Sequence, residues 1–185
     1  RQVSKEDPTI KIEINEETGE HLMSGMGELH LEVIENRIKA VKNVEVSTSP
    51  PIVVYRETCT KKGVEAEGKS PNKHNKLYFV VEPLPDAIAE QMKAGEIPEG
   101  RIKKKDIALR DKFTSAGMET KVADKVKDVF MGNIFVDQTR GIVHIGEIME
   151  MLLDMFEDVM KAGPLAREPC FKVMVSLMDC KLHED

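Results

Sequence analysis

The chain reads Thr18-Gly19-Glu20-His21-Leu22-Met23-Ser24-Gly25-Met26-Gly27-Glu28-Leu29-His30-Leu31-Glu32 where an expected strand passes directly into an expected helix. Gly25 and Gly27 have no side chain that would obstruct a sharp strand-to-helix turn. Glu28 lies in the first helical turn, where the positive end of the helix dipole favours a carboxylate. The same carboxylate would repel a phosphate, and no Lys-Ser or Lys-Thr follows the glycines. We therefore interpret the stretch as a packed turn and not as a phosphate-binding loop.

Hydrophobic periodicity extends this pattern on both sides of the turn. Apolar and charged residues alternate over 10–14, and with a return strand over 21–24 they predict a β-hairpin. A helix is expected over about 28–42, and Val44 and Val46 predict one more strand that ends at Pro50-Pro51. The residues expected to face the core from the helix are Leu31, Ile34, Ile38 and Val41. The order strand, strand, helix, strand is that of a ferredoxin-like domain without its first strand and helix.

The proline pair 50–51 is the best domain boundary in the sequence. Beyond it we expect a β-rich run over 52–59, a polar loop over 61–76 and a strand over 77–82. The segment 86–130 is highly charged and is interrupted by glycine and proline, which predicts two or three short helices.

The C-terminal part of the chain predicts a βαβ unit. It comprises a strand over 134–137, a helix over about 146–162 and a long strand over 171–182. The apolar face expected for the helix consists of Ile148, Met151, Leu152, Met155 and Val159.

The composition excludes several classes of protein. The 185 residues carry a net charge of −6, so no overall basic field points to nucleic acid, and any RNA contact must be a local patch. The three cysteines are widely spaced, which argues against a zinc site and a disulfide framework. No apolar run approaches the roughly 20 residues of a membrane span, and the first residues do not resemble a signal peptide.

The loop 61–76 is the strongest functional candidate. It holds five lysines and two glutamates, a local net charge of +3. Lysine ammonium groups neutralise phosphates, and hydroxyl and amide groups can donate hydrogen bonds to phosphate or sugar. The candidate contacts to RNA or the ribosome are Lys69, Ser70, Pro71, Asn72, Lys73, His74, Asn75 and Lys76. The alternative is a solvated hairpin tip, because polar loops are common at protein surfaces.

We find no residues for catalysis, a metal or a cofactor. His21 and His30 lack the spacing of metal ligands, His144 stands alone, and the sequence suggests no partner for His183. No Ser-His-Asp or Cys-His set can be assembled. The motif Asn72-Lys73-His74-Asn75 is similar to the guanine-binding Asn-Lys-x-Asp of GTPases but lacks its carboxylate, and no phosphate-loop motif occurs.

Several of these stretches resemble one family. Ser24 to Glu32 resembles the signature of the third domain of translation elongation factor 2 and elongation factor G. Ser70 to Asn75 is similar to a loop at the tip of the fourth domain of elongation factor 2, and residues 133–141 and 163–185 are similar to its archaeal and eukaryotic forms. The similarity covers nearly the whole chain, and departures lie mainly in 86–130.

The resemblance implies an α+β fold in two parts. Residues 1–51 would be a truncated ferredoxin-like domain III. Residues 52–185 would be the N-terminal part of domain IV, a partial ribosomal-protein-like βαβ domain with a left-handed crossover and a helical insertion at about 86–130. The chain would then be an internal fragment of an archaeal-type factor.

The resemblance also implies a function. The parent factor would be a cytoplasmic GTPase that promotes translocation of tRNA and mRNA through the ribosome. This chain would be its non-catalytic relay and decoding-site part, with GTP and magnesium bound in a domain outside it. Expected partners are the ribosome, the tRNA–mRNA duplex at the decoding site and the other domains of the factor. The alternatives are a free-standing RNA-binding module of ferredoxin-like fold and a small hydrolase, which would need an acid–base pair that we cannot find.

Overall fold

The chain folds into two compact units of mixed α and β structure. The computed structural model describes residues 7–14, 21–43, 45–51, 53–71, 73–142 and 145–183. The units are Arg1–Val54 and Tyr55–Asp185, so the division falls a few residues after the predicted boundary at Pro50-Pro51.

The first unit is a hairpin followed by a helix, as predicted. Strand β1 (Lys11–Ile14) pairs antiparallel with β2 (His21–Ser24), and α2 (Glu28–Lys42) follows. Along α2, Ile34 is buried and Leu31 and Ile38 are half-buried, but Val41 is 68% exposed, so its predicted burial is wrong. A sheet of two short strands is too small to cover the last turn of a fifteen-residue helix.

The turn between β2 and α2 is closed by His30. Its Nδ1 accepts a hydrogen bond from the Met26 N–H at 3.1 Å, and its Nε2 lies 2.9 Å from Asp7 Oδ2. A Cβ at position 25 would lie 3.0 Å from His30 Nδ1, so glycine is needed there for close approach. Gly27 has extended backbone and open space around it, so the expected steric need for a second glycine is wrong.

Two predicted strands are not formed by the described residues. Residues 45–51 have no strand pairing, and in 53–59 Glu57 makes only an isolated parallel bridge with Cys170. A strand needs a neighbour for its backbone N–H and C=O groups, and within the described part of the first unit β1 and β2 pair only with each other. Val44 and Ile52 lie outside the described residues.

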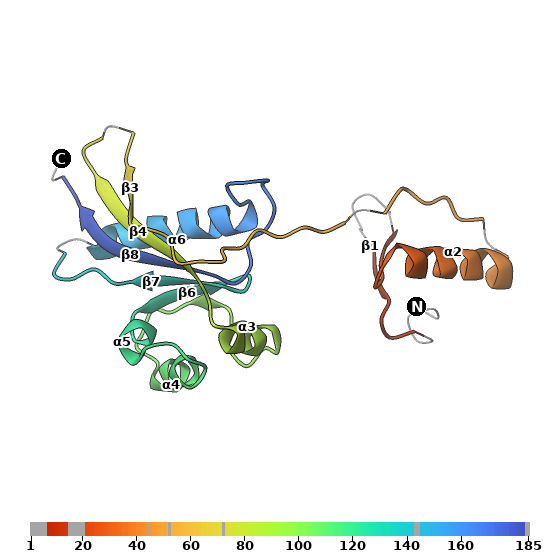
Figure 1. Cartoon of the computed structure of the whole chain (residues 1–185), viewed down its shortest axis with the longest axis horizontal. Coiled ribbons are helices and arrows are strands. Elements are labelled where there is room, and N and C mark those ends of the chain that lie inside the picture. The colour runs from red at the N-terminus through yellow and green to blue at the C-terminus, as the bar shows by residue number, and fades with distance from the viewer. Residues whose placement is uncertain are drawn as a thin grey trace. The chain divides into compact units, whose positions relative to one another are not determined.

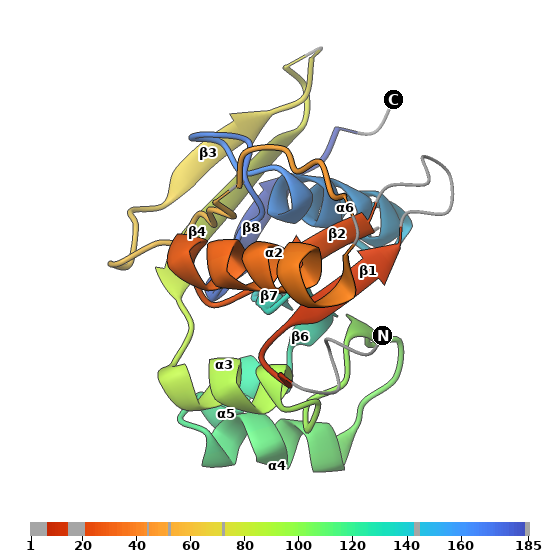
Figure 2. The ribbon, with the colours of Figure 1, turned by 90° about the vertical axis from the view of Figure 1, so that its right-hand side faces the viewer.

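The second unit is a mixed six-stranded sheet with helices on both faces (Figures 1 and 2). The strand order is β3 (Ala66–Lys69), β4 (Lys76–Pro83), β8 (Val173–Lys181), β7 (Asn133–Asp137), β6 (Val126–Phe130) and β5 (Gly100–Arg101). Among the described strands of this sheet, only β7 and β8 are parallel neighbours, and α6 (Ile145–Lys161) connects them, which confirms the βαβ unit. The hand of this crossover stays a prediction.

Two cores pack on the two faces of the sheet. Ile134 and Val136 of β7 face the core formed with α3 (Asp86–Lys93), α4 (Ile107–Ser115) and α5 (Thr120–Ala123), while Phe135 faces α6. This division follows from the alternation of side chains along a strand. Figure 1 shows α6 on one face and the three short helices on the other.

Three details of the second unit differ from the prediction. The segment 86–130, for which two or three helices were predicted, contains three helices but also β5 and β6. A bulge between Val126 and Asp128 disrupts the alternation that would have revealed β6. The predicted loop 61–76 contains β3. The buried face of α6 is rotated relative to the predicted face. Its buried residues are Leu152, Leu153, Phe156 and Met160. Of the residues predicted to be buried, Met151, Met155 and Val159 are 55%, 45% and 47% exposed.

Glu57 fixes the start of the second unit. Its carboxylate accepts hydrogen bonds from the backbone N–H groups of Leu165 at 2.9 Å, Ala166 at 2.7 Å and Glu168 at 3.2 Å. Arg167, with φ of 62°, helps to turn these amides toward one point, which makes a concave anion site. Burial acts to raise the pKa of the Glu57 carboxyl, but the hydrogen bonds outweigh it and hold the pKa below its usual value.

Replacing Gly163 with alanine is expected to break this anchor. The new Cβ would overlap the Glu57 carboxylate and lie 2.9 Å from Cys170 Sγ. Displacing the carboxylate removes hydrogen bonds worth about 1 kcal/mol each, so we expect urea denaturation to show a loss of roughly 1–2 kcal/mol. Gly146→Ala is the matched control, because its Cβ would meet nothing within 4 Å. An unchanged urea midpoint for Gly163→Ala would mean that Glu57 moves aside without cost.

Candidate nucleic-acid interface

The predicted contact residues lie at the turn of the β3–β4 hairpin, which projects beyond the sheet in Figure 1. Lys69 ends β3, Lys76 begins β4, and residues 70–75 join them. The side chains of Pro71, Lys73 and His74 are exposed. Asn72 lies outside the described residues.

Ser70 and Asn75 hold the turn together. The Ser70 N–H donates to the Asn75 carbonyl oxygen at 3.0 Å, and the Asn75 N–H donates to Ser70 Oγ at 3.1 Å. The Lys73 N–H donates to the Ser70 carbonyl oxygen at 2.8 Å, and Lys73 adopts a left-handed φ of 61°. Ser70 and Asn75, both predicted contact residues, therefore shape the loop that presents Lys73 and His74.

The C-terminal segment of the described chain joins this tip. The His183 N–H donates to Asn75 Oδ1 at 2.8 Å, and the rings of His74 and His183 meet edge to face with centroids 5.2 Å apart. Sequence reasoning found no partner for His183, because 108 residues separate it from Asn75 and only the pairing of β4 with β8 brings them together.

Three lysines form one row across three adjacent strands, which we call the lysine row. Lys69 lies opposite Lys76 in the β3–β4 pair, and Lys76 lies opposite Lys181 in the β4–β8 pair. Lys69 Nζ lies 3.0 Å from Glu67 Oε1, and the Lys181 ammonium lies 6.0 Å from the centroid of the Tyr78 ring. Lys181 was missed from sequence because it is outside the loop, and only the strand register identifies it.

An acidic row lies behind the lysine row. Glu67 is opposite Tyr78, and Tyr78 is opposite Asp179. The Tyr78 hydroxyl donates to Glu67 Oε2 at 2.8 Å. Hydrogen bonds from Lys69 and Tyr78 lower the pKa of the Glu67 carboxyl, and the bond to Glu67 raises the pKa of the Tyr78 phenol. This end of the sheet therefore carries positive charge at the tip and negative charge one row behind it.

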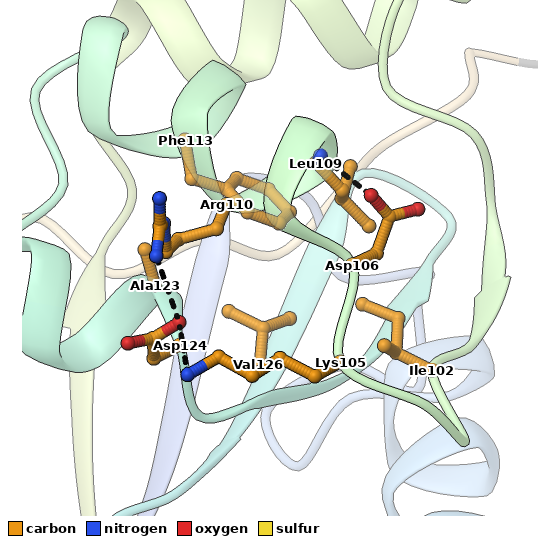
Figure 3. A pocket seen from close by; sticks show the side chains of 9 residues that line it. All are labelled: Ile102, Lys105, Asp106, Leu109, Arg110, Phe113, Ala123, Asp124 and Val126. Carbon is orange, nitrogen blue, oxygen red and sulfur yellow. Dashed lines mark hydrogen bonds and ion pairs between the residues drawn. The ribbon is translucent and has the colours of Figure 1, made fainter.

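A separate hollow lies between β6 and the helices α4 and α5 (Figure 3). Its volume is about 20 Å³, room for about one water molecule. The charged groups around it pair with one another: Lys105 Nζ and Arg110 Nη1 lie 3.5 and 3.8 Å from Asp124 Oδ1. Asp106 caps α4 by accepting a hydrogen bond from the Leu109 N–H at 3.0 Å. The hollow is too small for a nucleotide.

The described residues hold neither a metal-binding cluster nor a membrane-spanning helix. No group of three or more His, Cys, Asp or Glu side chains among them could hold a metal ion. No helix in the described part of the chain is long and apolar enough to cross a membrane.

Comparisons with known proteins match both units. The family model for "Elongation Factor G, domain III" matches residues 1–50, and that for "Elongation factor G, domain IV" matches residues 96–185. Proteins named elongation factor 2 from Methanococcoides methylutens and Thermococcus onnurineus are each 55% identical over 185 residues, which is 100% of this chain and 25% of theirs. Elongation factor 2 from Thermococcus kodakarensis is 52% identical with the same coverage. The chain spans about a quarter of the length of these relatives.

Proposed function

The chain belongs to the family of elongation factor 2 and elongation factor G as their domain III–IV region, and we propose that it serves in the translocation of tRNA and mRNA through the ribosome. Residues 1–51 would be part of domain III and would relay the nucleotide state of the factor. Residues 52–185 would begin domain IV and would reach the tRNA–mRNA duplex at the decoding site. The proposed place of action is the cytoplasm.

The observation that carries this proposal is the basic tip of the β3–β4 hairpin. The internal hydrogen bonds of Ser70 and Asn75 define the turn, and exposed Lys73 and His74 extend from it. A turn that is already ordered loses little conformational entropy on binding. Lysines at such a tip can neutralise the phosphates of an RNA backbone without reading its bases.

We infer that this chain does not itself hydrolyse GTP. The sequence contains no phosphate-loop motif. GTP and magnesium would bind in another domain of the longer factor.

Replacing Lys69, Lys73 and Lys76 with glutamate is expected to weaken binding to small ribosomal subunits. Each lysine accounts for about one phosphate contact, so the variant should lose about three contacts. The slope of log K against log salt should become correspondingly shallower. The measurement is co-sedimentation of the 185-residue chain with small subunits over a range of salt concentrations.

A matched variant replaces Lys93, Lys104 and Lys121 with glutamate, since these lysines are exposed on or between α3, α4 and α5. It makes the same change in charge and should bind more tightly than the tip variant. Equal salt slopes for the wild type and the tip variant would show that the loop is only a surface turn. Binding to short RNA without binding to ribosomal subunits would favour the free-standing RNA-binding module.

A further inference from the structure

We propose that Lys181 completes a phosphate-binding row with Lys69 and Lys76, and that this lysine row takes the phosphodiester backbone of RNA. The inference rests on the proposed function, because it extends the tip site from the β3–β4 hairpin to a third strand. The ligand chemistry is a run of negatively charged phosphate groups.

The register of the strands places the three lysines side by side. Directly opposite residues of antiparallel strands lie on the same face of a sheet, and neighbouring strands are about 4.8 Å apart. Lys69, Lys76 and Lys181 therefore bring three ammonium groups onto one face. Like charges placed directly opposite one another destabilise a sheet. A bound anion would remove this repulsion.

The neighbouring residues show which face of the sheet the lysine row occupies. The neighbouring pair Leu77 and Cys180 is turned inward: Cys180 is 4% exposed and Leu77 packs against the core beneath α6. Side chains alternate along a strand, so the lysine row points to the other face. Lys181 is exposed there, and the side chain of Lys69 is 47% exposed. A phosphate chain can therefore reach the row from solvent.

Neighbouring groups orient two of the three lysines. Glu67 holds Lys69 by an ion pair, and the ring of Tyr78 lies beneath Lys181. The acidic row holds two carboxylates, those of Glu67 and Asp179, against three ammonium groups. The two carboxylates offset part of the repulsion among the three ammonium groups, and the lysine row keeps a net positive charge. The row is thus partly preorganised for an anion at the end of the hairpin.

The test measures binding of the 185-residue chain to a labelled single-stranded RNA of about 12 nucleotides by fluorescence anisotropy. Salt is varied between about 50 and 200 mM. For Lys181→Gln we expect the slope of log K against log salt to become shallower by about 0.7, with a loss of affinity of about fivefold at the lowest salt. Lys181→Arg should keep the slope. Lys121→Gln, which removes an exposed lysine from α5, is the matched control and should bind as the wild type does.

A thermal melt separates binding from folding. Because Lys181→Gln relieves repulsion with Lys76, its Tm should equal or exceed that of the wild type while its affinity falls. If the glutamate variant of the tip loses binding but Lys181→Gln binds as the wild type, the lysine row is overturned and the proposed function stands. If the wild type does not bind the RNA, the lysine row is overturned, whereas the proposed function is decided by the co-sedimentation with small ribosomal subunits.

Discussion

Replacing Asn133 with leucine is expected to lower the free energy of unfolding by about 4 kcal/mol. The side chain is 0% exposed, and its Nδ2 group donates to the carbonyl oxygens of Phe130, Met131 and Cys170 at 3.2, 3.1 and 2.9 Å. Its Oδ1 accepts from the Val173 N–H at 3.0 Å. Leucine has a similar shape but leaves these backbone groups without their partner, and each buried unsatisfied group costs about 1–3 kcal/mol.

The measurement for Asn133→Leu is equilibrium denaturation in guanidinium chloride. Asn36→Leu is the control, because Asn36 is exposed on α2 and should change stability by no more than about 0.5 kcal/mol. A denaturation midpoint for Asn133→Leu equal to that of the wild type would show that the tight β6–β7 turn and the start of β8 hold together without this side chain.

Elements with a strong local pattern could be predicted from sequence. The hairpin of β1 and β2, the helices α2 and α6, and the strands β4, β7 and β8 each carry their own hydrophobic period. Strand β6 was missed because its bulge breaks that period. The alternation of Val44 and Val46 predicted a strand, but pairing depends on a neighbour that local sequence does not specify, and residues 45–51 have no strand pairing.

The packing of α6 shows a second limit of sequence reasoning. The helix has apolar residues on more than one side, so its periodicity admits more than one buried face. The contact of Phe156 with Phe135, with ring centroids 5.5 Å apart, shows which face meets the sheet. That choice depends on tertiary packing.

Part of the candidate site could likewise be predicted from local sequence, and part of it could not. The charge of the loop 61–76 is local, so its lysines could be found by counting. Lys181 and His183 belong to another strand, and Asn133 gains its hydrogen bonds from residues up to 40 positions away. Their roles depend on strand register, which a single sequence determines poorly.

A buried acid makes the stability of the second unit depend on pH. Asp128 is 1% exposed and lies opposite Arg101 in the β5–β6 pair. Arg101 also contacts three carboxylates of α6, those of Glu150, Asp154 and Glu157, at 2.7, 2.5 and 2.7 Å. Burial is the main cause that raises the pKa of Asp128 to about 6; the charge of Glu157 adds to the rise and that of Arg101 opposes it.

Asp128→Asn is therefore expected to stabilise the protein more at pH 8 than at pH 4, by roughly 2–3 kcal/mol. The pKa of Asp128 is about 6 in the folded protein against an ordinary value of 3.8, so the folded state binds the proton more tightly. The stability that this proton provides is fully present below pH 3.8 and is lost as the pH rises through 6. Asparagine cannot ionise, so the variant escapes that loss. Urea denaturation at several pH values measures the difference, with Asp111→Asn, on the exposed side of α4, as the control. A constant difference between Asp128→Asn and the wild type across this range would show that Asp128 stays ionised in the fold, with the charge of Arg101 compensating for its burial.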